Sequence, residues 1–292
     1  MFRDTTLRLE ARRQLERRTR EGLVFTFALV AAAASSCSGS DLVDEAPETG
    51  GTRLVEFERG TEPRRTLRAA PATPRTWRVL ATNVQTIRLD GAEETVRAEA
   101  TALTSVSFSS DSQGPVVTFW PRVEAFDAPF ETRLRDGQPG ATVQRYDERG
   151  LLLREVRFPR DISPAVLDAA TLEVFALPRG YLNVPEEPVG EGARWVLEID
   201  EVEYVIRVEE RIVAMDDDDV RVERTVTLAQ SRGRVESVEA TTAAVYETTT
   251  LFLREAQIDT RFTFSTTLPV DGKVADLSAT VTSSRTISEV AP

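Results

Sequence analysis

The chain of 292 residues contains no histidine. This absence excludes Ser-His-Asp and Cys-His nucleophilic sites, His-ligated zinc and an imidazole general base. The chemistry left to the chain rests on carboxylates, either as the paired acids of a glycoside hydrolase or as oxygen ligands for calcium.

Lysine is almost absent as well, since Lys273 is the one lysine among 36 basic residues. The 48 acidic residues give the chain a net charge of −12. An acidic surface is repelled by nucleic acid and by anionic headgroups, because phosphate recognition depends on clustered Lys and Arg. We therefore expect no nucleic-acid partner.

Cysteine occurs once, and this residue, Cys37, follows an apolar run. Leu23 to Val30 and the alanines at 31–34 make about a dozen residues, which suits a signal peptide and is too short for a bilayer span of about 20 residues. Five arginines between positions 12 and 20 precede the run, and polar residues follow the cysteine at once.

This order resembles a bacterial lipoprotein signal, in which small residues precede a cysteine that becomes the first residue of the mature protein. The resemblance implies removal of residues 1–36, a diacylglyceryl thioether on Cys37 and an acylated new N-terminus. Two or three acyl chains, such as palmitate, would anchor the chain stably in the cell envelope after export across the inner membrane. From the residues alone, a buried free cysteine and an ordinary secretory signal remain as alternatives.

Processing at Cys37 would change what the rest of the chain can do. Residues 1–36 contain seven arginines and four acids, so the mature chain has a net charge of −15. A lipidated Cys37 leaves no thiol for metal, redox or disulfide chemistry. Residues 37–53 are acidic, small and rich in turn formers, which predicts a flexible tether between the membrane and the fold.

Residues 54–292 are expected to form a single β-rich domain. In the stretches 94–108 and 220–228, apolar residues of one parity alternate with polar residues of the other. Such alternation predicts antiparallel strands with one dry and one wet face. Turn-forming sequences lie between the runs, among them LDGAEE at 89–94 and VDGK at 270–273.

One segment, 163–177, departs from the period of two. Ser163 suits an N-cap and Pro164 the first helical position. Apolar residues then recur at three- and four-residue spacing, at Leu167, Ala170, Val174 and Leu177. This pattern predicts one amphipathic helix.

The predicted helix separates two similar halves, 54–160 and 185–290, and each half begins a long strand with a tryptophan. The fold class that follows is mainly β, with antiparallel strands in two related halves, half-barrel or sandwich-like, and one connecting helix. In outline this is similar to the Lol-type lipoprotein carriers and related mycobacterial lipid-binding lipoproteins, an analogy of architecture alone.

The stretch VPEEPVGEGARWVLEI at 184–199 opens the second half. It resembles a P-x-E-P-V-G-x-G-A-R-W signature of an uncharacterised family of secreted bacterial lipoproteins, and EPRRTLR at 62–68 looks like a second feature of that family. The resemblance implies no reaction. The residues themselves favour a structural role, in which Pro188 and two glycines bend the chain into a strand whose Trp195 packs in the core.

Three groups of residues could carry chemistry. Asp216 to Asp219 could ligate calcium, but consecutive aspartates in a turn point in different directions, which favours a solvated hairpin tip. Adjacent acids such as Glu209 and Glu210 are common in a chain with so many acidic residues, so this pair does not indicate a glycosidase. The third group, which could line a ligand groove but is expected in the core, comprises Trp77, Trp120, Trp195, Phe119 and Phe126.

No catalytic residue, metal ligand or cofactor is therefore assigned, ligand-binding residues stay open, and Cys37 is the one assigned site, for lipidation. We expect a non-catalytic, membrane-anchored lipoprotein that binds a lipid or other apolar ligand in a concavity between sheet and helix. The alternative is a structural or protein-interaction lipoprotein with a solid core. A third hypothesis is a glycosidase with two acids about 5 to 9.5 Å apart in a cleft.

The lipoprotein hypothesis predicts the behaviour of Cys37→Ser. The substitution removes the acceptor thiol, so acylation and the lipoprotein-specific cut should both be lost, while the fold should be unaffected. Intact-mass measurement and detergent partitioning of the wild-type and variant proteins check this. Wild-type protein that keeps its N-terminus and stays in the aqueous phase would contradict the hypothesis.

Overall fold

The computed structural model describes residues 52–89, 92–127, 141–157, 180–200, 204–232, 235–270 and 273–290. Cys37, nearly all of the predicted tether and the helix predicted at 163–177 lie outside these described residues. Within them, no helix is long and apolar enough to cross a membrane.

Twelve strands form in the described part of the chain, and every neighbouring pair is antiparallel. Their bounds are β1 Thr52–Glu58, β2 Arg75–Leu89, β3 Ala92–Asp111, β4 Gly114–Asp127, β5 Thr142–Tyr146, β6 Leu152–Arg157, β7 Arg194–Asp200, β8 Tyr204–Met215, β9 Asp219–Ser231, β10 Val235–Glu247, β11 Leu253–Val270 and β12 Lys273–Glu289.

All twelve strands belong to one sheet, in the order β1-β7-β8-β9-β10-β11-β12-β2-β3-β4-β5-β6. The two meanders β2–β6 and β7–β12 are joined where β12 pairs with β2, from Leu277 opposite Leu89 to Glu289 opposite Trp77. The mainly β, antiparallel prediction is confirmed. The single open sheet agrees with its half-barrel form rather than with a sandwich of two sheets.

The position of β1 was not expected from the division into halves. Although β1 precedes the first meander in sequence, it pairs with β7 at the edge of the second meander. A side-chain ion pair reinforces this edge, with Arg53 Nη2 2.5 Å from Glu198 Oε2. The strand β6 forms the opposite edge of the sheet.

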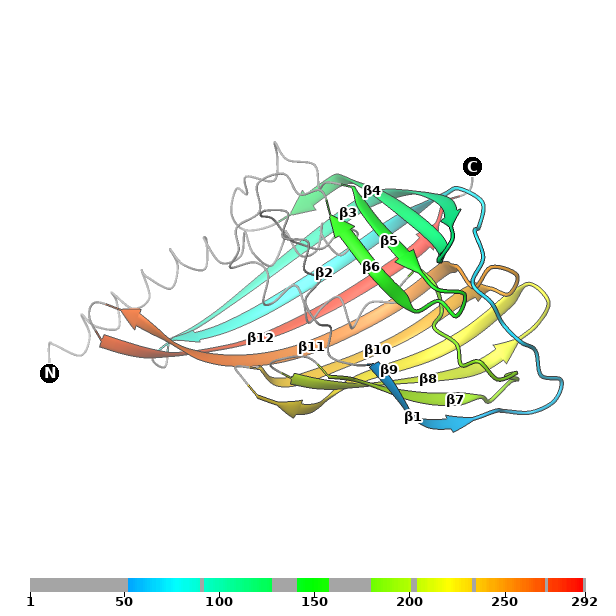
Figure 1. Ribbon diagram of the computed structural model, residues 1–292. Coiled ribbons are helices and arrows are strands. Elements are labelled where there is room, and N and C mark those ends of the chain that lie inside the picture. Colours follow the sequence, from blue (N-terminus) through cyan, green and yellow to red (C-terminus); the bar gives the residue numbers. More distant parts are fainter. Residues whose placement is uncertain are drawn as a thin grey trace, which may run out of the picture.

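The strands are long and curved, as Figure 1 shows. The longest, β3, has 20 residues and would extend about 66 Å at 3.3 Å per residue. Register shifts interrupt the pairing of β3 with β4 and of β8 with β9. Such bulges bend a strand and increase its twist, which suits a sheet that curls on itself.

Alternation sets which face of each strand is buried. In β9 and β10 nearly every second residue is buried and the residues between them are mostly exposed. We call the buried side of the sheet its inner face and the exposed side its outer face. Leu89 lies opposite Ala92 and Val270 opposite Lys273, so the chain reverses direction where turns were predicted. The Asp-Gly residues at 90–91 and 271–272 lie outside the described residues.

An aromatic core fills one end of the inner face. The Trp77 ring stacks on the Phe252 ring at 5.2 Å, and Phe108 meets Phe252 edge-on at 4.5 Å. The same buried cluster draws side chains from β3, β4 and β5 and from β7, β8 and β9. Strands far apart in the sheet order therefore share one core, because the sheet curls around it.

The two stretches assigned to a family signature lie against each other in the fold. Arg65 N donates to Val189 O at 2.8 Å, and Val189 N donates to Arg65 O at 3.0 Å. Gly190 N donates to Arg59 O at 3.0 Å. Trp195 is buried in the aromatic core, as expected for this residue.

This contact predicts that Gly190→Ala is strongly destabilising. A Cβ at Gly190 would lie 1.9 Å from Thr61 O, a backbone atom, so segment 59–65 would have to move. Gly192→Ala is the matched control, because a Cβ there meets nothing within 4 Å and only its left-handed φ of +80° carries a cost, about 1 kcal/mol. Urea unfolding should show the larger loss for Gly190→Ala, and equal losses would contradict this packing.

Candidate functional site

The inner face is layered, because the strand registers place inward residues of neighbouring strands opposite one another. The layer that borders the aromatic core is apolar and comprises Val79, Ile287, Ala256, Ala244, Val222 and Ile212. The next two layers mix polar and apolar side chains, and the apolar ones are Ala81 and Ile258 in the first and Val208, Val226 and Ala240 in the second. We call the polar side chains of these two layers the polar belt, namely Glu210, Arg224, Thr242 and Arg285 in one layer and Thr260, Ser283 and Asn83 in the next.

Two of the three charged members of the polar belt, Glu210 and Arg224, are paired with each other, and the third, Arg285, is 2% exposed. Arg224 Nε donates to Glu210 Oε1 at 2.7 Å, and the indole Nε1 of Trp195 donates to Glu210 Oε2 at 2.7 Å. The Glu210 side chain is 1% exposed and that of Arg224 is 7% exposed. These hydrogen bonds compensate for the burial of the two charges, because either charge alone would be costly to bury.

The uncharged part of the polar belt has a different character. Asn83 is 1% exposed, Ser283 4%, Thr242 4% and Thr260 9%. The Asn83 amide and the three hydroxyls have no hydrogen-bond partner among the described residues. Native proteins pair most buried polar side-chain atoms, so four such residues together mark an unusual place in the fold.

Beyond the polar belt the inner face is apolar again. We call this region the distal apolar cluster, which contains Ile199, Tyr204, Ile206, Val208, Val226, Val235, Val238, Ala240, Phe262 and Val281. Ile87 and Ala279 form a small buried group farther along β2 and β12. The ring contacts found among the described residues lie in the aromatic core and not in this cluster.

Two buried tyrosines lie near the aromatic core and have altered acidity. Burial raises the pKa of Tyr246 to about 12, while the nearby Arg224 charge opposes part of that rise. Burial also raises the pKa of Tyr181, whose hydroxyl donates to Ala70 O at 2.9 Å. Both phenols are therefore neutral at physiological pH and neither is an activated base.

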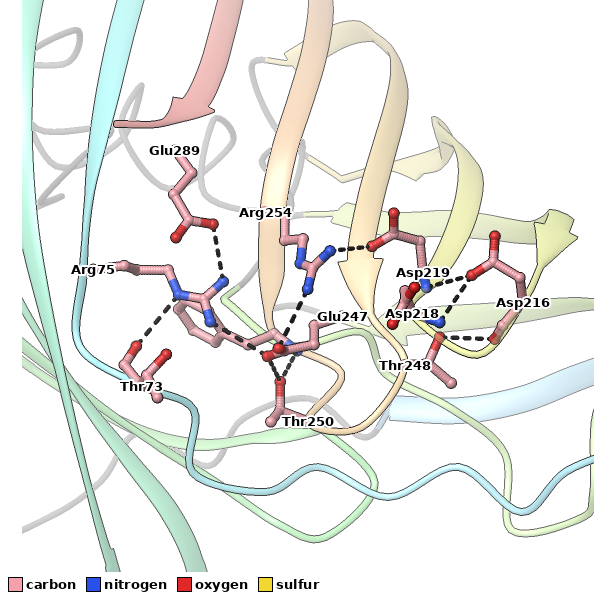
Figure 2. A network of polar contacts seen from close by, with 11 residues as sticks. Thr73, Arg75, Asp216, Asp218, Asp219, Glu247, Thr248, Thr250, Arg254 and Glu289 are labelled. Atoms are coloured by element: carbon pink, nitrogen blue, oxygen red, sulfur yellow. Dashed lines mark hydrogen bonds and ion pairs between the residues drawn. The ribbon is translucent and has the colours of Figure 1, made fainter. Parts of the chain in front are cut away.

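A network of arginines and acids ties strand ends together beside the aromatic core (Figure 2). Arg75 bonds Glu247 at 3.3 Å and Glu289 at 3.4 Å, and its guanidinium lies 5.5 Å from the centre of the Phe252 ring. Arg254 bonds Asp219 at 2.7 Å and Glu247 at 3.4 Å. Burial pushes the pKa of Glu247 upward, but the Thr250 hydroxyl, Arg75 and Arg254 outweigh it and hold that pKa below its usual range.

The four aspartates for which calcium binding was weighed against a hairpin tip lie at the turn between β8 and β9, where Asp219 begins β9. Asp216 accepts the backbone N–H groups of Asp218 and Asp219 at 2.9 and 2.8 Å, which lowers its pKa. Asp217 bonds Arg65 at 2.7 Å. Within the described residues, no three acidic or thiol side chains gather as a metal ion would require. The aspartates stabilise their turn and its contacts, as the hairpin-tip interpretation predicts.

The described part of the chain also has a groove on its outer face, with a volume of about 590 Å³. It crosses β9, β10, β11, β12 and β2, and its lining includes outward hydroxyls such as those of Thr225, Thr241, Thr282 and Ser284, together with atoms of the inward residues Val226, Ala240, Thr260 and Ser283. Glu239 and Asp259 line it as well, but both are exposed. A catalytic acid of a glycosidase needs burial to raise its pKa, so this groove does not carry the glycosidase hypothesis.

The aromatic residues considered in the sequence analysis lie on different faces of the sheet. Trp77 and Phe119 are buried in the aromatic core, as expected, together with Trp195. Trp120 is 49% exposed, so its expected core position is wrong. Phe119 and Trp120 are neighbours in β4, and a strand sends adjacent side chains to opposite faces. The side chain of Phe126 lies outside the described part of the chain.

The carboxylate pair Glu209 and Glu210 also divides between the two faces. Glu209 accepts from Arg194 Nε at 2.5 Å on the outer face, and that hydrogen bond lowers the pKa of Glu209. Glu210 points inward to Arg224. The two carboxylates therefore cannot act together on one substrate.

Comparisons with known proteins leave the chain without an assigned relative. The sequence matches no protein-family model and no curated protein at a significant level. Among solved structures, the crystal structure of Pseudomonas aeruginosa OccK11 (OpdR) aligns with 78% of this chain and 99% of its own, at 7% identity. Its TM-score is 0.17, which is too low for an argument about fold or function.

The geometry of the buried ion pair predicts a contrast between two adjacent glutamates. Glu210→Ala leaves Arg224 buried without its carboxylate, which should cost about 3–5 kcal/mol of folding free energy. Glu209→Ala removes a carboxylate that is 40% exposed and should cost about 1 kcal/mol or less. Urea unfolding at pH 7 measures both. Similar losses in the two variants would contradict the buried pairing.

A double variant separates the charge effect from packing. Glu210→Leu with Arg224→Met removes both charges and keeps side chains of comparable size. Replacing a whole buried ion pair by apolar groups is often close to neutral. The double variant should therefore be more stable than Glu210→Ala.

Proposed function

We propose that the protein is a non-catalytic cell-envelope lipoprotein, anchored through acyl chains on Cys37, that holds a lipid or other apolar ligand against the distal apolar cluster. The observation that carries this proposal is the layering of the inner face. One apolar cluster is a tightly packed aromatic core, and a second one is set apart from it by a belt of polar side chains. A domain that needed only a core would gain nothing from interrupting it with seven polar residues.

The side chains of the distal apolar cluster suit a flexible apolar ligand. Most are valine, isoleucine or alanine, which present short, stiff surfaces on neighbouring strands. Ligand sites in proteins are typically apolar surfaces with a few placed polar groups, which is the composition of this part of the inner face. The polar belt would set where an apolar chain ends.

The charge of the chain supports attachment through the lipid anchor. With a mature net charge of −15, the protein would be repelled by anionic headgroups. Acyl chains on Cys37 would hold it at the membrane despite this repulsion, since each buried methylene contributes about 0.8 kcal/mol. Proximity to lipid would then follow from the anchor.

The second candidate is a structural or protein-interaction lipoprotein with a solid interior. The aromatic core favours it, because the stacked and edge-on rings of Trp77, Phe252 and Phe108 leave that end of the interior well filled. The two candidates differ in what lies against the distal apolar cluster. A solid interior has protein side chains there, and a binding protein has a ligand.

Ala240→Phe distinguishes these candidates. Ala240 is an inward residue of the distal apolar cluster, and Ala243 is an exposed residue of the same strand, so Ala243→Phe is the matched control. If a ligand occupies the inner face, the added ring should displace it, with little loss of stability in the protein. Native mass spectrometry of protein extracted from membranes in mild detergent should show a non-covalent apolar ligand on wild type and Ala243→Phe, and not on Ala240→Phe.

A solid interior gives the opposite pattern. Overpacking a filled core costs about 1–3 kcal/mol, so Ala240→Phe would unfold at lower urea than Ala243→Phe. Wild-type protein would then carry only its covalent acyl chains. That pair of results would contradict ligand binding and support the interaction candidate.

A further inference from the structure

We propose that the uncharged part of the polar belt, formed by Asn83, Thr242, Thr260 and Ser283, binds the neutral, hydrogen-bonding head of an amphiphilic lipid of the acylglycerol type. This inference rests on the proposed function and names the class of its ligand. The acyl chain lies along the distal apolar cluster, and the glycerol hydroxyls meet the polar belt.

The strand registers bring these four residues together. Asn83 of β2 lies opposite Ser283 of β12, and Ser283 lies opposite Thr260 of β11. Directly paired residues on one face have Cβ atoms about 4.5–5.5 Å apart, so the three form a continuous row across three strands. Thr242 of β10 adjoins the row diagonally, because Thr260 lies opposite Ala240, two residues before it.

Burial makes this row costly for the protein on its own. Asn83 Oδ1 and Nδ2 and the hydroxyl oxygens of Thr242, Thr260 and Ser283 have no hydrogen-bond partner among the described residues, although all four residues are at least nine-tenths buried. Each unpaired buried group destabilises a fold by about 1–3 kcal/mol. A ligand that satisfies them would recover this free energy on binding.

The chemistry of the four side chains selects the ligand. An amide supplies two donors and an acceptor, and each hydroxyl can donate or accept, so a partner with both functions fits best. None of the four carries a charge. In the adjoining layer Glu210 and Arg224 neutralise each other at 2.7 Å, and the buried Arg285 has an interaction of its own. A vicinal diol joined to an ester matches the donors and acceptors of the four uncharged side chains.

The position of the row explains why the ligand is an amphiphile. Ser283 and Val281 are consecutive inward residues of β12, and Thr260 and Phe262 are consecutive inward residues of β11. The polar row thus borders the distal apolar cluster along both strands. A molecule whose polar head adjoins a long apolar chain matches that border.

The test uses the full chain in mild detergent with three radiolabelled probes, 1-monooleoylglycerol, oleate and hexadecane, and counts the lipid retained after gel filtration. The variant is Ser283→Ala with Thr260→Val, which removes two inward hydroxyls. Its matched control is Ser284→Ala with Thr241→Val, which removes one serine and one threonine hydroxyl from exposed positions. Ser284 follows Ser283 in sequence, and Thr241 lies on the outer face of β10. The inward variant should bind monooleoylglycerol about tenfold more weakly, since two hydrogen bonds are lost, and should bind hexadecane unchanged.

The free energy of unfolding gives a second readout, because binding and structural roles for the hydroxyls predict opposite changes in it. Removing unsatisfied hydroxyls should leave the ligand-free protein as stable as the control or more stable. If the hydroxyls instead serve the fold, the inward variant unfolds at lower urea and keeps its affinity for monooleoylglycerol, which would overturn the proposal. Stronger retention of oleate than of monooleoylglycerol would also overturn it, because an anionic head would then be the better fit.

The outcomes separate this inference from the function on which it rests. One outcome is that the chain retains hexadecane, binds monooleoylglycerol no more tightly than hexadecane, and loses no affinity for monooleoylglycerol in the inward variant. The proposed head site would then be wrong, and binding of apolar ligands would still be supported. If none of the three probes is retained by the wild-type chain, the proposed function itself fails.

Discussion

The pairing of β12 with β2 is the contact on which the rest of the structure depends. Without it the chain would form two separate meanders, each with an inner face too small to enclose a core. With it, one register runs across β8 to β12 and into β2, so that inward residues of strands distant in sequence line up in layers. The polar belt exists only because this register continues through the joint, where Ser283 meets Asn83.

The layering also explains how the protein tolerates polar residues in its interior. Glu210, Arg224 and Trp195 form a closed set of hydrogen bonds next to the aromatic core, where the surroundings are most strongly apolar. Thr260, Ser283 and Asn83 lie one layer farther out, and Thr242 shares the layer of Glu210 and Arg224. The charges of Glu210 and Arg224 thus have partners within the fold, whereas the neutral groups of the polar belt have none among the described residues.

The sequence predicted the local features of the fold and missed the long-range ones. Alternation located the strands, and Asp-Gly pairs located two hairpins, because both signals act between neighbours in the chain. The edge pairing of β1 with β7 carries no such local signal. Trp120 was placed in the core because aromatic residues favour the interior, yet the parity of β4, with Phe119 inward, sends it outward. The helix predicted at 163–177 lies outside the described residues and stays a prediction.

The candidate site was missed for a related reason, although a signal for it was present. In β12, Ser283 and Arg285 occupy the same parity as Val281 and Ile287, so polar residues stand where the alternation calls for apolar ones. The same holds for Arg224 between Val222 and Val226 in β9. A single such exception in one strand is ambiguous. Several exceptions become a belt only when the registers show that they lie side by side.

The joint between β12 and β2 also has a consequence for how the protein is made. Its partners are far apart in the chain, as shown by Thr282 and Val84, which are 198 residues apart and share a hydrogen bond. Because a polypeptide is synthesised from its N-terminus, β2 can pair with β3 early, but its other edge stays open until the last strand is made. An open edge of 15 residues is a template for wrong pairing. Slow synthesis would lengthen that exposure, so the chain should depend on chaperones during the interval before its C-terminal strand closes the edge.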